Sequence, residues 1–347
     1  MKRNKKKILK VISVCIMLVI ILIAGYKIKE NIRINKIVKS HQTKQNTEQN
    51  DVVKNNDVND SVHISTAVQQ IMIGTMCNNY DNALQTLLAI KNAGYDSIEL
   101  NDFMIHKSSI LVKLMTKFSG IPIGNGGKLD WPKLIEESGL KVISLHSNLG
   151  SIENDAKAIA DEAKNFGTDT VVITGMYQFD YSSLDDVKEL AKRLNQAGKA
   201  LSEEGIRLLY HNHNVELQKV TSEKTAYDII IEETDPAHLN FEFDSYWMAD
   251  GGTNVPALME KLGSRMKLWH INDRGYTKSG PYMTPILKEN ATELGNGNMD
   301  LDTLSAIAKK TGVEGVVLET HQNWVDNDPI KSLQVSAKYI LEQFGDK

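Results

Sequence analysis

From about residue 70 to the C-terminus, short apolar runs alternate with longer stretches in which apolar residues recur every three or four positions. The first pattern predicts buried strands, and the second predicts amphipathic helices. The helix expected over 81–94, for example, carries Leu84, Leu87 and Leu88 on one face and ends at Gly94. The eight expected strands are 71–76, 97–101, 141–147, 170–175, 206–213, 239–244, 266–273 and 315–321.

Eight strand–helix repeats within roughly 270 residues are typical of a (β/α)8 TIM barrel. The strands are continuous apolar runs, which indicates a parallel sheet covered by helices. A doubly wound open sheet is the alternative, and it would carry a glycine-rich phosphate turn after an early strand. The glycine-rich segment 124–128 lies in a connection that follows a helix instead. We therefore predict an α/β fold with a TIM barrel over residues 70–347.

The first forty residues have a different pattern. Six Lys/Arg residues among the first ten precede an uncharged, largely apolar run over 11–26. With Ile8 and Leu9, this run approaches the length that a membrane span requires. A cleaved signal peptide is the alternative, but no small-residue cleavage pattern follows the run. We predict that residues 1–39 form a basic cytoplasmic N-terminus with a single transmembrane helix, which would place the barrel on the extracytoplasmic side of the cell membrane.

Residues 40–69 are rich in Asn, Gln, Asp and Lys and offer little to bury, so we predict a flexible, disordered linker. Eleven Lys/Arg against one Glu give residues 1–39 a charge of +10, which leaves −14 on the rest of a chain whose total is −4. An acidic barrel repels phosphate backbones, so nucleic acid is excluded as a partner. The chain has two cysteines, and one of them, Cys15, lies in the predicted anchor, so this is no disulfide scaffold.

Polar residues stand where most of the expected strands end. In a TIM barrel the carboxyl ends of the strands meet at one mouth, and the active site lies there. Six of the eight expected strands end in residue types that ligate metals or transfer protons, and we interpret this convergence as an active site. These residues are Glu99, His146, His211 with His213, Asp244, His270 with Asp273, and Glu319 with His321.

Three of these residues come from three successive strands: Asp244, His270 and Glu319. Buried charges usually pair or coordinate metals. Two carboxylates and an imidazole form a mixed oxygen and nitrogen set that suits Mn²⁺, Mg²⁺, Co²⁺ or Zn²⁺. We therefore predict one divalent metal ion as the cofactor.

A further ligand is expected from the preceding strand and its loop. His211 and His213 alternate on one face of the strand, so both can point into the barrel, and Glu216 follows in the loop. The spacing does not choose among the three. We favour Glu216 or His213 as the ligand, with His211 facing the substrate.

Five segments together resemble a known family. They are YHNHNVEL (210–217), LNFEFDSYWMADGG (239–252), LWHINDRG (268–275), ELGNGNMDLDTL (293–304) and VVLETHQNWVDNDPIKSL (316–333). In that order they resemble the xylose isomerase-like sugar (phosphate) isomerase/epimerase superfamily, a group of TIM barrels related to endonuclease IV. The resemblance covers about residues 70–345. It implies one divalent metal held by Asp244, His270 and Glu319, with either His213 or Glu216 as the fourth ligand.

The sequence departs from endonuclease IV itself, which uses three zinc ions and further histidines. Trp247 stands where one of these histidines would be. Together with the acidic barrel, this departure argues against DNA repair. Arg274 is the one cation at the strand ends, so we expect an unphosphorylated small-molecule sugar as the substrate.

A metal site of this kind supports proton abstraction next to a carbonyl through an enediolate. The function we predict is a metal-dependent sugar isomerase or epimerase. The alternatives are a lyase or dehydratase acting on 3-keto sugars or glycosides, and a non-catalytic, anchored sugar-binding protein. The predicted bases are Glu216 and Glu319, and the predicted proton donors are His146 and His211. The residues predicted to bind substrate are Glu99, Asn212, Trp247, Asp273 and Arg274.

Overall fold

A computed structural model describes residues 25–41, 63–109, 113, 116, 124–176, 178–275 and 290–345. The chain divides into two compact units, residues 1–55 and 56–347. In the first unit, residues 25–41 are helical. The apolar run of the predicted anchor lies mainly in residues 1–24, outside the described residues, as does 42–62 of the predicted linker. Within the described ranges, no helix is both long enough and apolar enough to cross a membrane.

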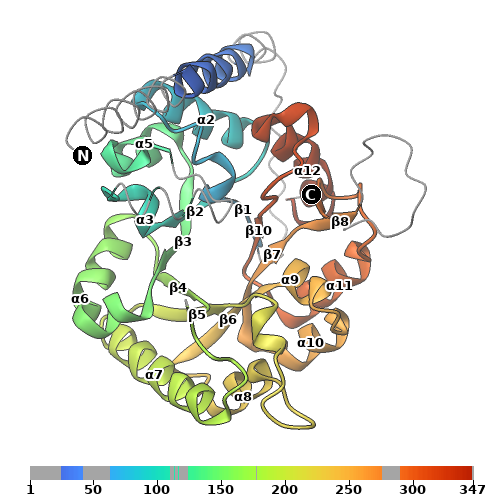
Figure 1. Cartoon of the computed structure of the whole chain (residues 1–347). Helices are drawn as coiled ribbons and strands as arrows, with labels where there is room; N and C mark the ends of the chain where they lie inside the picture. Colours follow the sequence, from blue (N-terminus) through green and yellow to red (C-terminus); the bar gives the residue numbers. More distant parts are fainter. Residues whose placement is uncertain are drawn as a thin grey trace, which may run out of the picture. The chain divides into compact units, whose positions relative to one another are not determined.

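The second unit is a TIM barrel, as predicted. Within the part of it that the structure describes, eight parallel strands close in the order β1-β10-β7-β6-β5-β4-β3-β2, and helices surround them (Figure 1). The strands are β1 Ser65–Gln69, β2 Ser97–Asn101, β3 Lys141–Ser147, β4 Thr170–Thr174, β5 Arg207–His211, β6 Leu239–Asp244, β7 Met266–Ile271 and β10 Gly315–Leu318.

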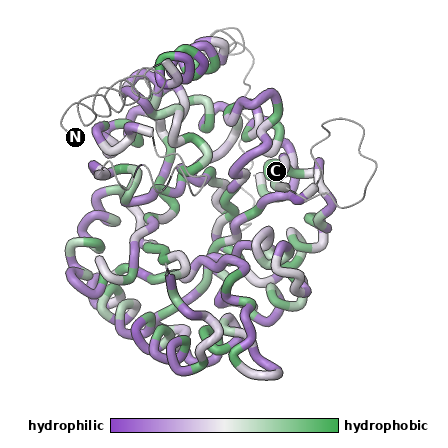
Figure 2. The backbone as a smooth tube through the Cα atoms, viewed as in Figure 1, coloured by the Kyte–Doolittle hydropathy of each residue, from purple (hydrophilic) through white to green (hydrophobic). Residues whose placement is uncertain are grey.

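The surrounding helices are amphipathic, and hydrophilic and hydrophobic residues alternate along them (Figure 2). In the longest, Ser183 caps the first turn, while Val187, Leu190 and Leu194 are buried. The helices are α2 Tyr80–Asn92, α3 Asp102–Ile105, α5 Trp131–Ser138, α6 Leu149–Asn165, α7 Leu184–Glu203, α8 Ala226–Glu233, α9 Ser245–Asp250, α10 Val255–Leu262, α11 Leu301–Thr311 and α12 Pro329–Phe344.

Short elements connect these parts. An antiparallel ribbon, β8 Asp273–Gly275 with β9 Asn290–Thr292, follows β7. The 3-10 helices are η1 Gln70–Ile73, η2 Gly126–Lys128, η3 Val215–Leu217, η4 Gly263–Arg265 and η5 Val325–Asn327.

The barrel interior changes from apolar to polar along the strands. Val172, Leu209 and Leu268 form a small apolar cluster of their own. Side chains two positions apart on a strand share a face. The position that follows Leu209 on this face is therefore His211, and the one that follows Leu268 is His270. The carboxyl half of the interior is thus lined with groups that transfer protons or bind metals.

The first strand was predicted wrongly at 71–76. β1 occupies Ser65–Gln69 and pairs with β10 and β2, so the barrel begins inside the segment predicted as linker. The apolar run after it turns at once into η1, because the Gln69 side chain accepts a hydrogen bond of 2.9 Å from the Ile71 backbone N–H. A short buried run looks alike in a strand and in a turn of helix, so hydrophobicity alone misplaced this element.

Candidate active site

Strand register brings the candidate residues together at the carboxyl end of the barrel. His211 of β5 lies opposite Glu242 of β6, and Asp244 of β6 lies opposite His270 of β7. Glu319 directly follows β10. Glu242 and Asp244 are two positions apart and therefore share the inner face of β6. All five side chains are buried.

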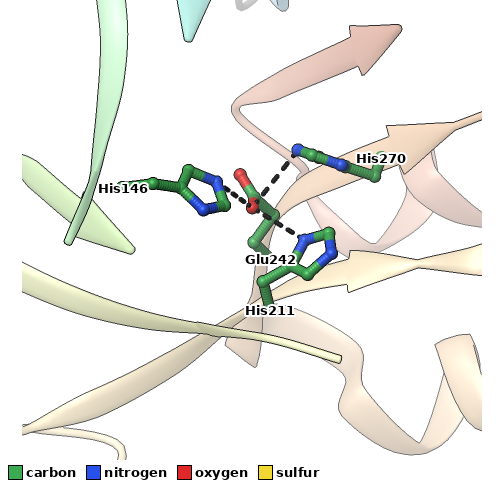
Figure 3. Close-up of side chains that lie close together, drawn as sticks. All are labelled: His146, His211, Glu242 and His270. Atoms are coloured by element: carbon green, nitrogen blue, oxygen red, sulfur yellow. Dashed lines mark hydrogen bonds and ion pairs between the residues drawn. The ribbon is translucent and has the colours of Figure 1, made fainter. Parts of the chain in front are cut away.

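The deepest part of the site centres on Glu242. Its Oε2 lies 3.1 Å from His146 Nε2, 3.0 Å from His211 Nδ1 and 3.2 Å from His270 Nε2 (Figure 3). Glu242 was not among the predicted residues. A signal for it existed, because a carboxylate inside a buried apolar strand must find partners.

Glu99, which the sequence predicts to bind substrate, lies beside this group. Its Oε1 is 2.8 Å from His146 Nε2 and 2.8 Å from His270 Nε2, and it accepts a hydrogen bond of 2.9 Å from Gln69 Nε2. Ser144 donates to its other oxygen. His146 is thus held between two buried carboxylates. Burial lowers the pKa of His146, but Glu99 and Glu242 outweigh this effect and raise it to about 10.

The part of the site nearer the mouth combines Asp244, His270 and Glu319. His270 Nδ1 lies 2.9 Å from Glu319 Oε2 and 3.9 Å from Asp244 Oδ2. The other oxygen of Glu319 is 3.1 Å from His321 Nε2. Asp244 also accepts a hydrogen bond of 2.8 Å from the Trp247 backbone N–H and so caps α9.

Two overlapping sets of donors could hold a metal ion. One is His146, His211, Glu242 and His270, and the other is His211, Asp244, His270 and Glu319. Within each set, one ligand atom per residue lies within 4.8 Å of all the others. Buried imidazoles and carboxylates at this spacing are the donors that Zn²⁺, Mn²⁺ and Co²⁺ use in proteins. The residues therefore fit a divalent metal site.

The pKa values of Glu319 and His270 also fit a metal site. Burial alone would raise the pKa of Glu319, but His321 and His270 hold it well below its ordinary value. Burial lowers the pKa of His270, and Glu242, Glu99 and Glu319 together raise it well above its ordinary value. Carboxylates that share protons with buried imidazoles are the arrangement in which metal binding replaces protons.

Of the three candidates from the fifth strand, the structure brings only His211 into these donor sets. The Glu216 carboxylate accepts hydrogen bonds from the Tyr210 hydroxyl at 2.8 Å and from the His213 backbone N–H at 3.0 Å. Burial raises the pKa of Glu216 to about 7. His213 lies further out, and burial lowers its pKa to about 3, so its imidazole is neutral at pH 7.

The rim of the site contains rings. The His213 ring centroid is 5.4 Å from that of Trp247, which is 5.8 Å from that of His321. These side chains lie next to the candidate metal donors. The His213 ring centroid is 5.1 Å from that of His211, and His321 contacts Glu319. Flat rings beside a metal site suit the apolar face of a sugar or a cyclic polyol.

The remaining predicted substrate-binding residues contact protein groups. Asn212 exchanges two hydrogen bonds of 3.0 Å with the backbone of Asp244, which ties β5 to β6. Arg274 lies 3.3 Å from Asp250. The Asp273 carboxylate accepts from four backbone N–H groups, those of Arg274, Gly295, Gly297 and Met299.

The sequence matches a family described as xylose isomerase-like TIM barrel over residues 87–342. The chain belongs to this family. Its similarity to inosose dehydratase from Clostridium beijerinckii is 24% identity over 219 residues, which cover 61% of this chain and 67% of that enzyme. The inosose dehydratases of Clostridium perfringens and Clostridium tetani are 25% identical to this chain over 167 residues. The chain therefore spans about half, 55%, of the length of these enzymes.

Solved structures share the fold of this xylose isomerase-like barrel. A sugar phosphate isomerase/epimerase from Parabacteroides distasonis superposes with a TM-score of 0.62 at 20% identity, covering 83% of this chain and 98% of that one. A structure described as IOLI protein with a binding zinc atom superposes with a TM-score of 0.58 at 17% identity, covering 81% and 98%. The predicted family and the predicted TIM barrel are confirmed.

Proposed function

We propose that this protein is a metal-dependent isomerase or epimerase that moves a proton next to the carbonyl of a sugar or keto-polyol. One observation carries the proposal: His211, Asp244, His270 and Glu319 bring buried ligand atoms within 4.8 Å of one another at the carboxyl end of the barrel. This is where TIM-barrel enzymes carry out their chemistry.

In this proposal the same four residues hold one divalent ion, and His211 takes the place that we had expected for His213 or Glu216. The ion would supply Lewis acidity, which stabilises negative charge on the oxygens of a hydroxy-ketone. His211 is favoured because its ring lies among the other donors, whereas both oxygens of Glu216 are engaged by Tyr210 and His213.

Proton transfer is assigned to Glu319, which is also one of the four donors, and to side chains at the rim. Glu319 is the base, because its Oε1 faces His321 and the pair can pass a proton to and from the rim. His213 is neutral at pH 7 and can accept a hydrogen bond from a substrate hydroxyl. Trp247 lies between these two imidazoles and would contact the ring of the substrate.

A dehydratase is the second candidate, and the similarity to inosose dehydratase supports it. After the same proton abstraction, a hydroxyl on the next carbon leaves instead of the proton returning. His321 is the imidazole placed to give that hydroxyl a proton, because burial lowers its pKa but Glu319 outweighs this effect and raises it above the ordinary value. The two candidates differ in their product, since an isomerase conserves the mass of the substrate and a dehydratase removes one water.

We also propose that the substrate is uncharged and that residues 1–39 anchor the chain in a membrane with the barrel outside the cytoplasm. The pairing of Arg274 with Asp250 supports the first point, because it occupies the cation expected at the strand ends. The second rests on six cations ahead of an uncharged run. Recovery of the full chain, without detergent, in the soluble cytoplasmic fraction would contradict the anchor.

The test of the function is elemental analysis of the purified full-length chain, followed by mass spectrometry with unphosphorylated ketoses, keto-polyols and their phosphates. We expect about one divalent ion per chain and conversion of an uncharged hydroxy-ketone. Asp244→Asn is the control that should abolish both. A wild-type chain that binds no divalent metal would refute the proposal, and turnover restricted to sugar phosphates would refute the assigned substrate class.

A further inference from the structure

The proposed metal needs a lone pair from one nitrogen of His211 and from one nitrogen of His270. A neutral imidazole has one nitrogen that donates and one that accepts, and only the second can ligate a metal. Which nitrogen this is depends on the hydrogen bond that the other makes. The structure shows these bonds, and they lead to Glu242.

Both imidazoles direct their inner nitrogen at carboxylates. His211 Nδ1 lies 3.0 Å from Glu242 Oε2, and His270 Nε2 lies 3.2 Å from the same atom. His270 Nε2 is also 2.8 Å from Glu99 Oε1. Glu242 is fully buried, and its Oε2 is the point on which three imidazoles converge (Figure 3).

A carboxylate only accepts hydrogen bonds, so each nitrogen that faces it carries a proton. The three imidazoles around Glu242 Oε2 favour the ionised carboxylate, because a protonated carboxyl could donate to only one of them. His211 is then protonated at Nδ1 and His270 at Nε2. His211 Nε2 then keeps its lone pair. His270 Nδ1 also faces a carboxylate, that of Glu319, and carries a proton that a metal held by Glu319 and Asp244 would displace.

We propose that Glu242 is a positioning residue that sets opposite tautomers in His211 and His270, so that each presents its lone pair to the metal. The inference rests on the metal site proposed above. Carboxylates that accept the N–H of a ligating histidine fix its orientation and raise its basicity. Glu242 serves two such histidines at once from the strand that also carries Asp244.

The backbone supports this role. The pairing of β6 with β7 shifts register between Phe241 and Glu242, and that of β2 with β3 shifts between Ile98 and Glu99. Local irregularities of this kind re-aim side chains, as β-bulges next to active sites do. Both carboxylates that face His270 Nε2 therefore come from places where the strand ladder is locally rearranged.

The experiment compares Glu242→Gln with the wild-type chain and with Glu293→Gln. Glu293 is also a buried carboxylate, but its oxygens accept from the Val325 backbone and the Thr292 hydroxyl and from no histidine. Affinities for Zn²⁺ and Co²⁺ are measured by competition with a chelator, and the Co²⁺ absorption spectrum reports the ligand set. ¹⁵N NMR of histidine-labelled, Zn²⁺-loaded protein reports which nitrogen carries hydrogen.

We expect Glu242→Gln to bind the metal about 10–100-fold more weakly with an unchanged Co²⁺ spectrum, since the ligands themselves remain. Glu293→Gln should bind as the wild type does. The NMR spectra should show hydrogen on Nδ1 of His211 and on Nε2 of His270. If Glu242→Gln does not fold, Glu242→Asp, which keeps the charge but withdraws the oxygen, should show the same weakening.

Equal affinity in Glu242→Gln and wild type would overturn the inference while leaving the metal site intact. A changed Co²⁺ spectrum would make Glu242 a ligand and would also overturn it, as would either imidazole with its hydrogen on the other nitrogen. Absence of metal binding by the wild type would instead overturn the proposed function, and this inference with it.

Discussion

Replacing Glu216 by glutamine should change how the stability of the protein depends on pH. Burial raises the pKa of this carboxyl from 4.5 to about 7, so the folded protein holds the proton more tightly than the unfolded chain does. The resulting stabilisation is fully present below pH 4.5. It decreases as the pH rises towards 7 and is lost above that value.

The magnitude follows from this pKa difference. Each tenfold change in proton affinity is worth about 1.4 kcal/mol, so the shift corresponds to about 3 kcal/mol. Glutamine does not titrate. The difference in unfolding free energy between Glu216→Gln and wild type should therefore move by about 3 kcal/mol in favour of the variant between pH 4.5 and pH 8. Any constant cost, such as the glutamine amide facing the His213 N–H, cancels in this comparison.

The assay is urea unfolding of metal-free protein at several pH values in this range. Glu189→Gln is the matched control for the loss of one carboxylate charge, because this carboxylate is exposed. A difference for Glu216→Gln that stays constant across the range would refute the reasoning. The same variant should keep its metal affinity if His211 is the fourth ligand, and loss of metal would return Glu216 to the ligand set.

Three further changes test the site and the fold. Asp244→Asn should lose its metal and activity but keep its circular dichroism spectrum, because the asparagine oxygen can still cap α9; retained metal would contradict its role as a ligand. Gly198→Ala should lower the unfolding free energy by about 1–3 kcal/mol, since a Cβ there would lie 1.9 Å from the His238 carbonyl oxygen. Gly150→Ala, whose nearest contact would be 3.5 Å, is its control, and equal stabilities in urea would contradict the packing argument. Asp273→Asn replaces an oxygen that accepts backbone hydrogen bonds and should lower the unfolding free energy by about 2 kcal/mol. Proteolysis within residues 290–299 should become faster. Cleavage at the wild-type rate would show that this loop does not depend on the carboxylate.

The amino-acid sequence by itself determined the architecture and the location of the chemistry. Alternating apolar runs and amphipathic stretches specify a parallel barrel, because each strand must be covered by the helix that follows it. The carboxyl ends of such strands meet at one mouth. Asp244, His270 and Glu319 were therefore expected to lie near one another whatever the details of packing. The structure brings all three together.

Only the tertiary structure decided which residue joins them. His211, His213 and Glu216 lie within six positions of one another, and η3, Val215–Leu217, directs Glu216 back to Tyr210. The same holds at the start of the barrel, where buried apolar residues after Gln69 form a turn of helix in place of the expected strand.

Glu242 shows why such side-chain contacts could not be predicted from the sequence. Its partner His211 is 31 residues away in the chain, and the contact between Glu99 and His270 joins residues 171 apart. Periodicity reports which face of a strand is buried. The pairing of a particular oxygen with a particular nitrogen depends on the register and bulges of neighbouring strands, and these are set only when the barrel closes.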